Sequence, residues 1–330
     1  MYFYIKKMTI IHIMKLFGEM YKSIKQTIRF IKKSSNWTKS VLFLSILLIT
    51  IITVNKYGEP VGVEAFTQRE KYVLKQGTDI YDDFYCDIYD DLVYDDIKNK
   101  YEIDELSRLL DINKSTVLDV GCGTGHHAKQ FSKLGAKVYG IDKSASMIKK
   151  SKKNCPEGNF KTGDVLDLTH YNTNSFNYIN CLYFTVYYIK NKLGFFKNCY
   201  RWLKPGGALI LHLVNREKFD PIVAAGDPLV MVSPQKFAKK RITNTVVKFK
   251  DFKYKSNFKF YREKDLAVFE ENLKDDTSGN IRANKLSLHM NTQKHILSLA
   301  KSVGFIMKGK IDMIHCMYEY QYIYILYKPK

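Results

Sequence analysis

One short stretch, residues 117–125, constrains the fold of this chain more than any other. It reads Val-Leu-Asp-Val-Gly-Cys-Gly-Thr-Gly, a run of mainly apolar residues followed by glycine at every second position. Glycine has no Cβ, so such a loop adopts positive φ easily and lets a ligand lie against bare backbone. A helix after the loop offers unpaired N–H groups to an anionic group. The stretch therefore predicts a strand, a ligand-binding loop and a helix in succession.

The sequence around this loop alternates between short apolar runs and longer helical patterns. The predicted strands are 116–120, 137–141, 159–163, 177–182 and 208–214, and the predicted helices are 126–134, 144–154 and 190–203. An acidic helical lead-in is expected over 79–110, and a last helix (292–303) and two strands (305–312, 320–327) follow an antiparallel stretch over 243–290. This order predicts an α/β, doubly wound and mostly parallel sheet with an antiparallel insertion.

The spacing of the glycines separates two classes of ligand. Dinucleotide-binding loops favour G-x-G-x-x-G, whereas here Gly121, Gly123 and Gly125 are followed by His126. Asp119, two residues before the first glycine, would repel a pyrophosphate but suits a ligand that carries an ammonium or sulfonium group. The pattern therefore favours S-adenosylmethionine.

These nine residues closely resemble the first motif of the class I S-adenosylmethionine-dependent methyltransferases. Further motifs follow in the family's order: the second strand ending in an acid (138–142), Gly-Asp-Val (163–165), strand four (176–182) and Leu-Lys-Pro-Gly-Gly (203–207). Together the motifs cover roughly residues 80–215. The resemblance implies a seven-stranded sheet whose last strand is antiparallel, with S-adenosylmethionine as the co-substrate and no metal.

The resemblance also implies which residues bind the cofactor. Asp142 matches the acid that binds the ribose hydroxyls, and 81–92 resembles a Tyr-Asp-x-x-Tyr helix that covers the cofactor, with Tyr85 and Tyr89 on one face. The predicted cofactor-binding residues are Tyr85, Tyr89, Asp119, Gly121, Cys122, Gly123, Asp142, Lys143, Met147, Asp164, Val165 and Leu182. No catalytic residue is assigned, because methyl transfer from a sulfonium needs a base only for acceptors that must lose a proton early.

Two features depart from the family's pattern or invite a different interpretation. Family members usually have Asp where this chain has Asn177, so Asn177 is given no catalytic role. Adjacent His126 and His127 point to different sides of a helix, which argues against joint metal binding. The six cysteines show no CxxC pair, so reduced thiols are expected.

The N-terminal region has a different character from the rest. Residues 1–39 form a basic tail that alternates Lys with apolar residues, and residues 40–54 contain no charge. A full membrane span needs about 20 apolar residues; extending the run to residue 57 approaches that length if Lys39 and Lys56 snorkel. The sequence predicts an amphipathic tail (1–39), a membrane-associating helix (40–57) and a methyltransferase domain (60–330) with an insertion at about 215–290.

The predicted function is methyl transfer to a small molecule, lipid or protein. Two alternatives stay open: a non-catalytic, membrane-tethered S-adenosylmethionine-binding module, and a nucleic-acid methyltransferase. The formal charge of +20 fits an anionic partner, but only 8 of the 53 basic residues are arginine, and arginine is the usual reader of phosphate and base edges. The lysine excess is equally typical of biased composition, so a nucleic-acid partner is not favoured.

The predicted localisation is a membrane, reached through residues 40–57, with the catalytic domain facing the cytoplasm. Nine basic residues precede the uncharged run, which by the positive-inside rule keeps the N-terminus cytoplasmic and would send the domain across a true span. A helix lying along the cytoplasmic face resolves this conflict, because the cofactor and the free thiols suit the cytosol.

Overall fold

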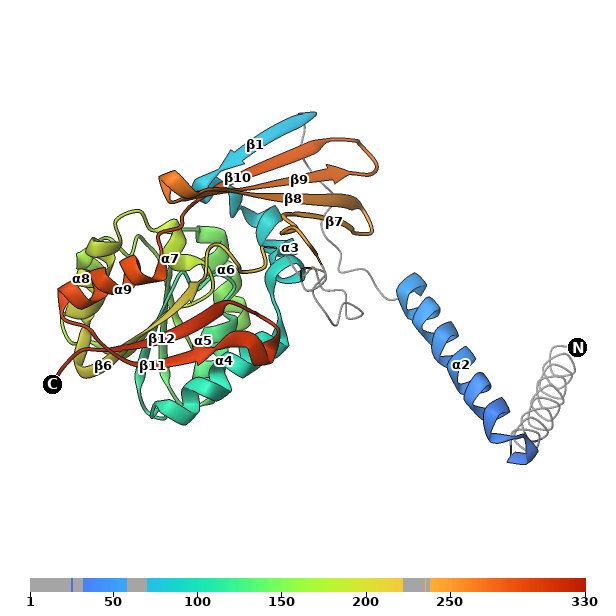
Figure 1. Ribbon diagram of the computed structural model, residues 1–330, viewed down its shortest axis with the longest axis horizontal. Coiled ribbons are helices and arrows are strands. Elements are labelled where there is room, and N and C mark those ends of the chain that lie inside the picture. The colour runs from blue at the N-terminus through green and yellow to red at the C-terminus, as the bar shows by residue number, and fades with distance from the viewer. Residues whose placement is uncertain (1–24, 26–31, 58–69, 222–234, 236–237) are drawn as a thin grey trace, which may run out of the picture. The chain divides into compact units, whose positions relative to one another are not determined.

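The computed structural model describes residues 25, 32–57, 70–221, 235 and 238–330 (Figure 1). The chain divides into two compact units, residues 1–62 and 63–330, and each is described by itself. Most of the predicted basic tail and residues 222–234 of the predicted insertion lie outside the described residues.

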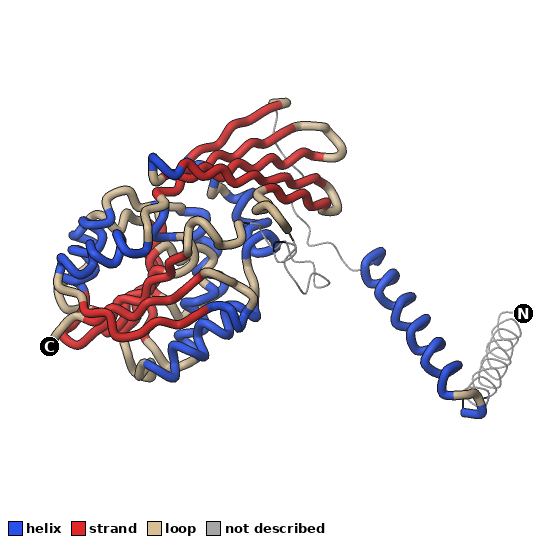
Figure 2. Tube along the Cα trace, viewed as in Figure 1, coloured by secondary structure: helices blue, strands red, loops and turns tan. Residues whose placement is uncertain are grey.

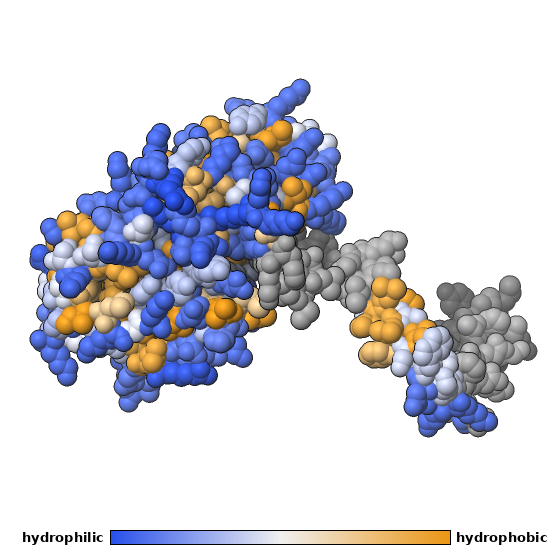
Figure 3. All heavy atoms as spheres, in the orientation of Figure 1, coloured by the Kyte–Doolittle hydropathy of each residue, from blue (hydrophilic) through white to orange (hydrophobic). Residues whose placement is uncertain are grey.

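The first unit contains one long helix, α2 (Asn36–Tyr57). Its sequence is apolar on all sides, and large side chains along it are exposed, among them Phe43 (66%), Leu44 (60%) and Ile49 (62%). Figure 3 shows these apolar side chains on the helix surface. A helix that is hydrophobic all round is normally buried in a protein or a membrane, so the unit presents an uncovered apolar surface.

The expectation of a transmembrane helix is wrong for the part of the chain that the structure describes. None of the helices there has the length and apolar character needed to cross a membrane. The uncharged run between Lys39 and Lys56 is several residues shorter than the about 20 that a span requires.

The second unit is built on a seven-stranded sheet with the order β11-β12-β6-β5-β2-β3-β4. The central strands run parallel, and β12 is antiparallel to both of its neighbours, β6 and β11. The strands are β2 (Thr116–Val120), β3 (Lys137–Asp142), β4 (Asn159–Thr162), β5 (Phe176–Cys181), β6 (Leu203–Val214), β11 (Ile306–Asp312) and β12 (Gln321–Tyr327). This confirms the predicted α/β class and the mostly parallel sheet.

Helices cover both faces of this sheet, and two separate cores result (Figures 1 and 2). The helices are α3 (Asp83–Val93), α4 (Asp96–Leu109), α5 (His126–Lys133), α6 (Ala145–Asn154), α7 (Thr185–Tyr188), α8 (Lys192–Trp202) and α9 (Gln293–Val303). One core packs α4, α5 and α6 against the sheet, and the other packs α7, α8 and α9. Burial of large side chains such as Trp202 and Phe131 stabilises each layer by about 2–3 kcal/mol per side chain.

The predicted helical lead-in over 79–110 is three elements rather than one. A short 3-10 helix, η1 (Gly77–Ile80), precedes α3 and α4. Asp82 accepts a hydrogen bond from the Tyr85 N–H, and Asp95 accepts one from the Lys98 N–H. These are N-cap interactions, which start a new helix at each aspartate and explain the break.

The insertion forms a second sheet of five strands with the order β1-β10-β9-β8-β7. The strands are β1 (Tyr72–Gln76), β7 (Asn244–Lys248), β8 (Phe252–Tyr261), β9 (Leu266–Asp275) and β10 (Ile281–His289). Strands β7 to β10 are antiparallel, as predicted, but β1 comes from the start of the unit and pairs in parallel with β10. This sheet lies next to η1, α3 and α7 (Figure 1).

Candidate cofactor and acceptor site

The glycine loop lies at the carboxyl end of β2, where the chain turns into α5. Gly121, Gly123 and Gly125 have φ of +65°, +51° and +84°, values that disfavour side chains with a Cβ. The N–H of Gly121 donates to the carbonyl of Ile141 at 2.8 Å, which ties the loop to the end of β3. A Cβ on Gly121 would lie 2.5 Å from Cγ2 of Thr185, at the start of α7. The loop is therefore a tight cradle of bare backbone.

Asp142, the last residue of β3, links the two strand ends. Its Oδ2 accepts the Gly123 N–H at 3.0 Å, and its Oδ1 accepts the Ser144 N–H at 2.9 Å. Burial raises the pKa of this carboxyl, and the hydrogen bonds from Ser144 and Gly123 oppose that rise. The Lys143 N–H also acts on this carboxylate, so of its about four acceptor positions one is left for a further donor such as a hydroxyl.

Asp119 lies one layer below the loop, in β2, and is almost completely buried. Burial raises its pKa to about 6; nearby His127 opposes the rise, and the charges of Asp142 and Glu102 add to it. A buried carboxyl that is costly to ionise becomes cheaper to ionise when a cation lies next to it. Asp119 thus favours a positively charged ligand at the loop.

The other predicted residues divide into polar and apolar groups. Lys143 and Asp164 follow neighbouring strands and form an ion pair at 2.8 Å between Nζ and Oδ2. The side chains of Met147, Val165 and Leu182 are buried in the cores. Cys122 is also buried, and its Sγ lies 2.9 Å from the place of a Cβ on Gly140, so its side chain points away from the loop.

The helix α3 is fixed beside this loop by polar contacts. The carbonyl of Tyr81 accepts the Ser144 hydroxyl at 2.6 Å, and Asp90 accepts the Thr124 hydroxyl at 2.7 Å. Tyr89 faces the loop, with its Cε1 4.0 Å from the place of a Cβ on Gly123. Tyr85 is directed elsewhere: its hydroxyl donates to both oxygens of Glu271 in β9, at 2.8 and 2.9 Å.

Sequence reasoning missed two residues of this region: Thr185 against Gly121, and Glu271. A signal for Glu271 was available, because it shares the alternation of Phe269 and Leu273 in β9 and so had to face inward with them. Tyr188, which the sequence offers only as a possible base, has its hydroxyl 3.1 Å from that of Tyr81.

The two features singled out at the sequence level have structural explanations. Asn177 is the second residue of β5, at the end opposite the glycine loop, and its Oδ1 accepts the Thr116 N–H and the Lys204 ammonium, each at 3.0 Å. His127 pairs with buried Glu102 at 2.7 Å, whereas His126 stacks on Tyr94. Among the described residues, no three His, Cys, Asp or Glu side chains are grouped to hold a metal.

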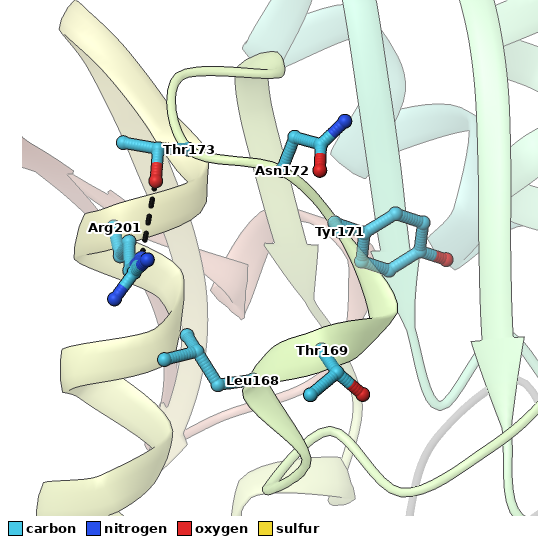
Figure 4. A pocket seen from close by; sticks show the side chains of 6 residues that line it. All are labelled: Leu168, Thr169, Tyr171, Asn172, Thr173 and Arg201. Carbon is cyan, nitrogen blue, oxygen red and sulfur yellow. Dashed lines mark hydrogen bonds between the residues drawn. The ribbon is translucent and has the colours of Figure 1, made fainter.

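A separate hollow is lined by residues of η2 (Leu168–His170), of the segment after it and of α8 (Figure 4). Its lining residues are Leu168, Thr169, Tyr171, Asn172, Thr173 and Arg201, and the Arg201 Nε–H donates to the Thr173 hydroxyl at 3.1 Å.

Comparison with known proteins agrees with this geometry. Residues 118–211 match the model of a methyltransferase domain family. The matched residues include the glycine loop and Asp142, so this part of the chain is similar to a methyltransferase domain. A ubiquinone biosynthesis O-methyltransferase of Xanthomonas oryzae is 32% identical over 122 residues, which are 36% of this chain and 51% of that protein. The chain therefore spans about half the length of the curated relatives it matches.

Solved structures show the same fold at low sequence identity. An S-adenosylmethionine-dependent methyltransferase from Clostridium acetobutylicum has a TM-score of 0.56 and 15% identity, covering 74% of this chain and 98% of its own. The CcbJ methyltransferase from Streptomyces caelestis has a TM-score of 0.57 and 15% identity, covering 76% and 98%. At this identity the likeness concerns the fold alone.

Proposed function

We propose that this methyltransferase binds S-adenosylmethionine at the glycine loop and transfers its methyl group to a small-molecule acceptor. The observation that carries the proposal is the joining of Gly123 and Asp142 at the carboxyl edge of the sheet, the place where open α/β sheets bind ligands. The residues fit the cofactor: the loop has no room for a Cβ at Gly121, and Asp142 keeps an acceptor position for a ribose hydroxyl.

The chain's own residues would orient the cofactor and place a negative charge near its cationic groups. Bound S-adenosylmethionine provides a methyl group already activated on a sulfonium. Asp119 lies below the loop as a buried negative charge that favours the cationic ligand, and Tyr89 and Thr185 flank the loop. Such orientation and exclusion of water contribute much of the catalysis in a direct displacement. Tyr187, His212 and His315 stay without a catalytic assignment; Tyr187, for example, accepts the Val214 N–H at 2.8 Å in the core.

We propose the class of the acceptor by analogy with the matched relatives. The matched relatives are named as ubiquinone biosynthesis O-methyltransferases, and none of the comparisons given above favours a nucleic-acid acceptor or a non-catalytic binding module. The test is incubation of the full chain with methyl-labelled S-adenosylmethionine and a panel of small acceptors, with S-adenosylhomocysteine measured by mass spectrometry. Product that depends on acceptor in the wild type and vanishes in Asp142→Ala supports the proposal. Absence of product with every acceptor, from protein that binds the cofactor, counts against it.

We also propose that residues 40–57 hold the protein at a membrane surface, with the catalytic domain on the cytoplasmic side. The support is the row of exposed apolar side chains on α2, including Phe43, Leu44 and Ile49. Deleting residues 36–57 should move the protein from the membrane to the soluble fraction after cell lysis. A full chain already recovered in the soluble fraction would contradict this localisation. Glycosylation of Asn113, which begins an Asn-Lys-Ser acceptor, would contradict the orientation.

A further inference from the structure

The five-stranded sheet has one covered face and one open face. On the covered face Phe252, Tyr254, Leu273 and Leu286 pack with residues of η1 and α3. Successive side chains of a strand point to opposite faces, so the residues between these point outward. Each of the five strands carries exposed side chains at those outward positions. We call this surface the outer face of the sheet.

Exposed lysines dominate the outer face. The strand register places six lysines and one acid on it: Lys248, Lys253, Lys255, Lys259, Lys274, Lys285 and Glu270.

Three of these lysines form a row across the sheet. Lys248 lies directly opposite Lys253, and Lys253 lies directly opposite Lys274. Like charges directly opposite each other destabilise a sheet, so the row has a cost in the isolated protein. Within the described residues only Lys259 of the six forms an ion pair, with Glu270 at 2.6 Å between Nζ and Oε2. An anionic partner at this face would therefore offset repulsion that the chain itself leaves uncompensated.

Negative charge is concentrated on the covered side of the sheet. Residues 78–105, which include α3 and most of α4, contain eleven acids and two lysines. Because α3 packs against the covered face, the charge of the unit is divided across the sheet, with basic residues outside and acidic residues behind. Such a distribution turns the outer face toward an anionic surface as the protein approaches it.

Apolar side chains among the lysines distinguish between kinds of anionic partner. Tyr72 and Leu74 in β1 and Val246 in β7 point outward and are 56%, 49% and 59% exposed. A bilayer interface accepts lysine heads together with aliphatic and tyrosine side chains. A nucleic acid is bound mainly by arginine forks and stacked aromatic rings. In the described strands the outer face has no arginine and no row of aromatic rings, which favours the bilayer.

We propose that the outer face of the five-stranded sheet docks on an anionic lipid bilayer. The lysines contact the headgroups, where each contributes about fivefold to the affinity. Tyr72, Leu74 and Val246 enter the boundary between headgroups and acyl chains. This inference concerns the second unit alone, so it depends neither on methyl transfer nor on the role proposed for residues 40–57.

Co-sedimentation of the full chain with lipid vesicles tests the charged part of this face. The vesicles contain phosphatidylcholine alone, or phosphatidylcholine and phosphatidylserine in equal amounts. The sheet variant combines Lys253→Gln, Lys255→Gln and Lys274→Gln. We expect it to lose at least tenfold of the wild-type affinity for the mixed vesicles, and the wild-type affinity itself should fall as salt is added.

A matched control removes the same charge from elsewhere in the unit. It combines Lys133→Gln, Lys152→Gln and Lys153→Gln, three exposed lysines of α5 and α6. The control should lose less than twofold of the affinity for the mixed vesicles. All three proteins keep residues 1–57, so any contribution of the basic tail and α2 is the same in each.

A second pair of variants tests the apolar part and does not depend on the folding of the sheet variant. Leu74→Ser should lose at least threefold of the affinity for the mixed vesicles. Leu109→Ser, which changes a similarly exposed leucine (53%) at the end of α4, should change it by less than 1.5-fold.

Three results would overturn the inference. The first is an equal loss in the sheet variant and its lysine control, and the second is an unchanged affinity in both the sheet variant and Leu74→Ser. The third comes from binding to single-stranded polyuridine. If the sheet variant loses more affinity for this RNA than for the mixed vesicles, the outer face is a nucleic-acid surface instead.

Discussion

The two halves of the site are built in different ways. On the cofactor side the contacts join residues close in sequence, such as Gly123 with Asp142, which are 19 positions apart. Where α3 meets the five-stranded sheet they join distant residues: Tyr85 with Glu271 across 186 positions, and Asp82 with Arg282 across 200. The first region uses bare backbone at strand ends, and the second uses buried side-chain charges. A local motif can therefore reveal the glycine loop, whereas only the assembled fold reveals the contacts of α3 with the second sheet.

The largest effect is expected from Gly121→Val, which breaks the cofactor half. A branched side chain at a φ of +65° is strained by about 1–2 kcal/mol and must displace Thr185 from the cradle. Affinity for S-adenosylhomocysteine, measured by calorimetry, should fall at least a thousandfold, or about 4 kcal/mol. Gly279→Val is the control, because Gly279 has a similar φ of +69° but open space around it. Tight binding by Gly121→Val would show that the ligand lies elsewhere.

Removing a contact between distant residues should instead lower the free energy of unfolding. Arg282 is buried and donates two hydrogen bonds to Asp82, at 2.8 and 2.9 Å, and another to the Ile80 carbonyl. Arg282→Ala removes these donors. Because Asp82 is partly exposed and keeps the Tyr85 N–H and Lys75 as partners, we expect a loss of about 2–3 kcal/mol in the free energy of unfolding. Urea denaturation measures this loss. The exposed Arg262–Glu217 pair is the control, and Arg262→Ala should cost less than about 1 kcal/mol; equal losses in the two variants would contradict the assignment.

The smallest effect concerns Asp119. Its burial makes the free energy of unfolding depend on pH through the region of the glycine loop. Its pKa of about 6 lies above the ordinary value of 3.8, so between those values the folded protein binds more protons than the unfolded one. Without cofactor, Asp119 therefore lowers stability progressively from pH 4 to 6, and the penalty stays constant above.

Asp119→Asn removes that penalty. Relative to wild type, the variant should gain about 2 kcal/mol of unfolding free energy between pH 4 and pH 7, as measured by urea denaturation at both values. It should also bind S-adenosylhomocysteine more weakly, because the negative charge next to the ligand's ammonium is gone. A stability difference that does not change with pH would mean that Asp119 titrates normally.

The sequence predicted most of the main sheet because each strand is marked by a short apolar run before a turn. The largest difference is the start of β6, at Leu203 rather than 208, because the Leu-Lys-Pro-Gly-Gly segment already belongs to the strand. The pairing of β1 with β10 joins Tyr72 to Ile281 and has no local pattern to reveal it. The contact of Tyr85 with Glu271 also joins distant segments, so no local pattern around Tyr85 reveals it.

Calorimetric titration of S-adenosylhomocysteine into the full chain tests the central claim most directly. We expect one binding site per chain, and a 10- to 100-fold loss of affinity, about 1–3 kcal/mol, in Asp142→Ala, because ribose hydroxyls would lose a charged acceptor. Lys149→Ala, which removes only an exposed ion pair with Asp83, should change the affinity by less than threefold. Absence of binding by protein that unfolds cooperatively, or equal binding by wild type and Asp142→Ala, would contradict the assignment of the cofactor site.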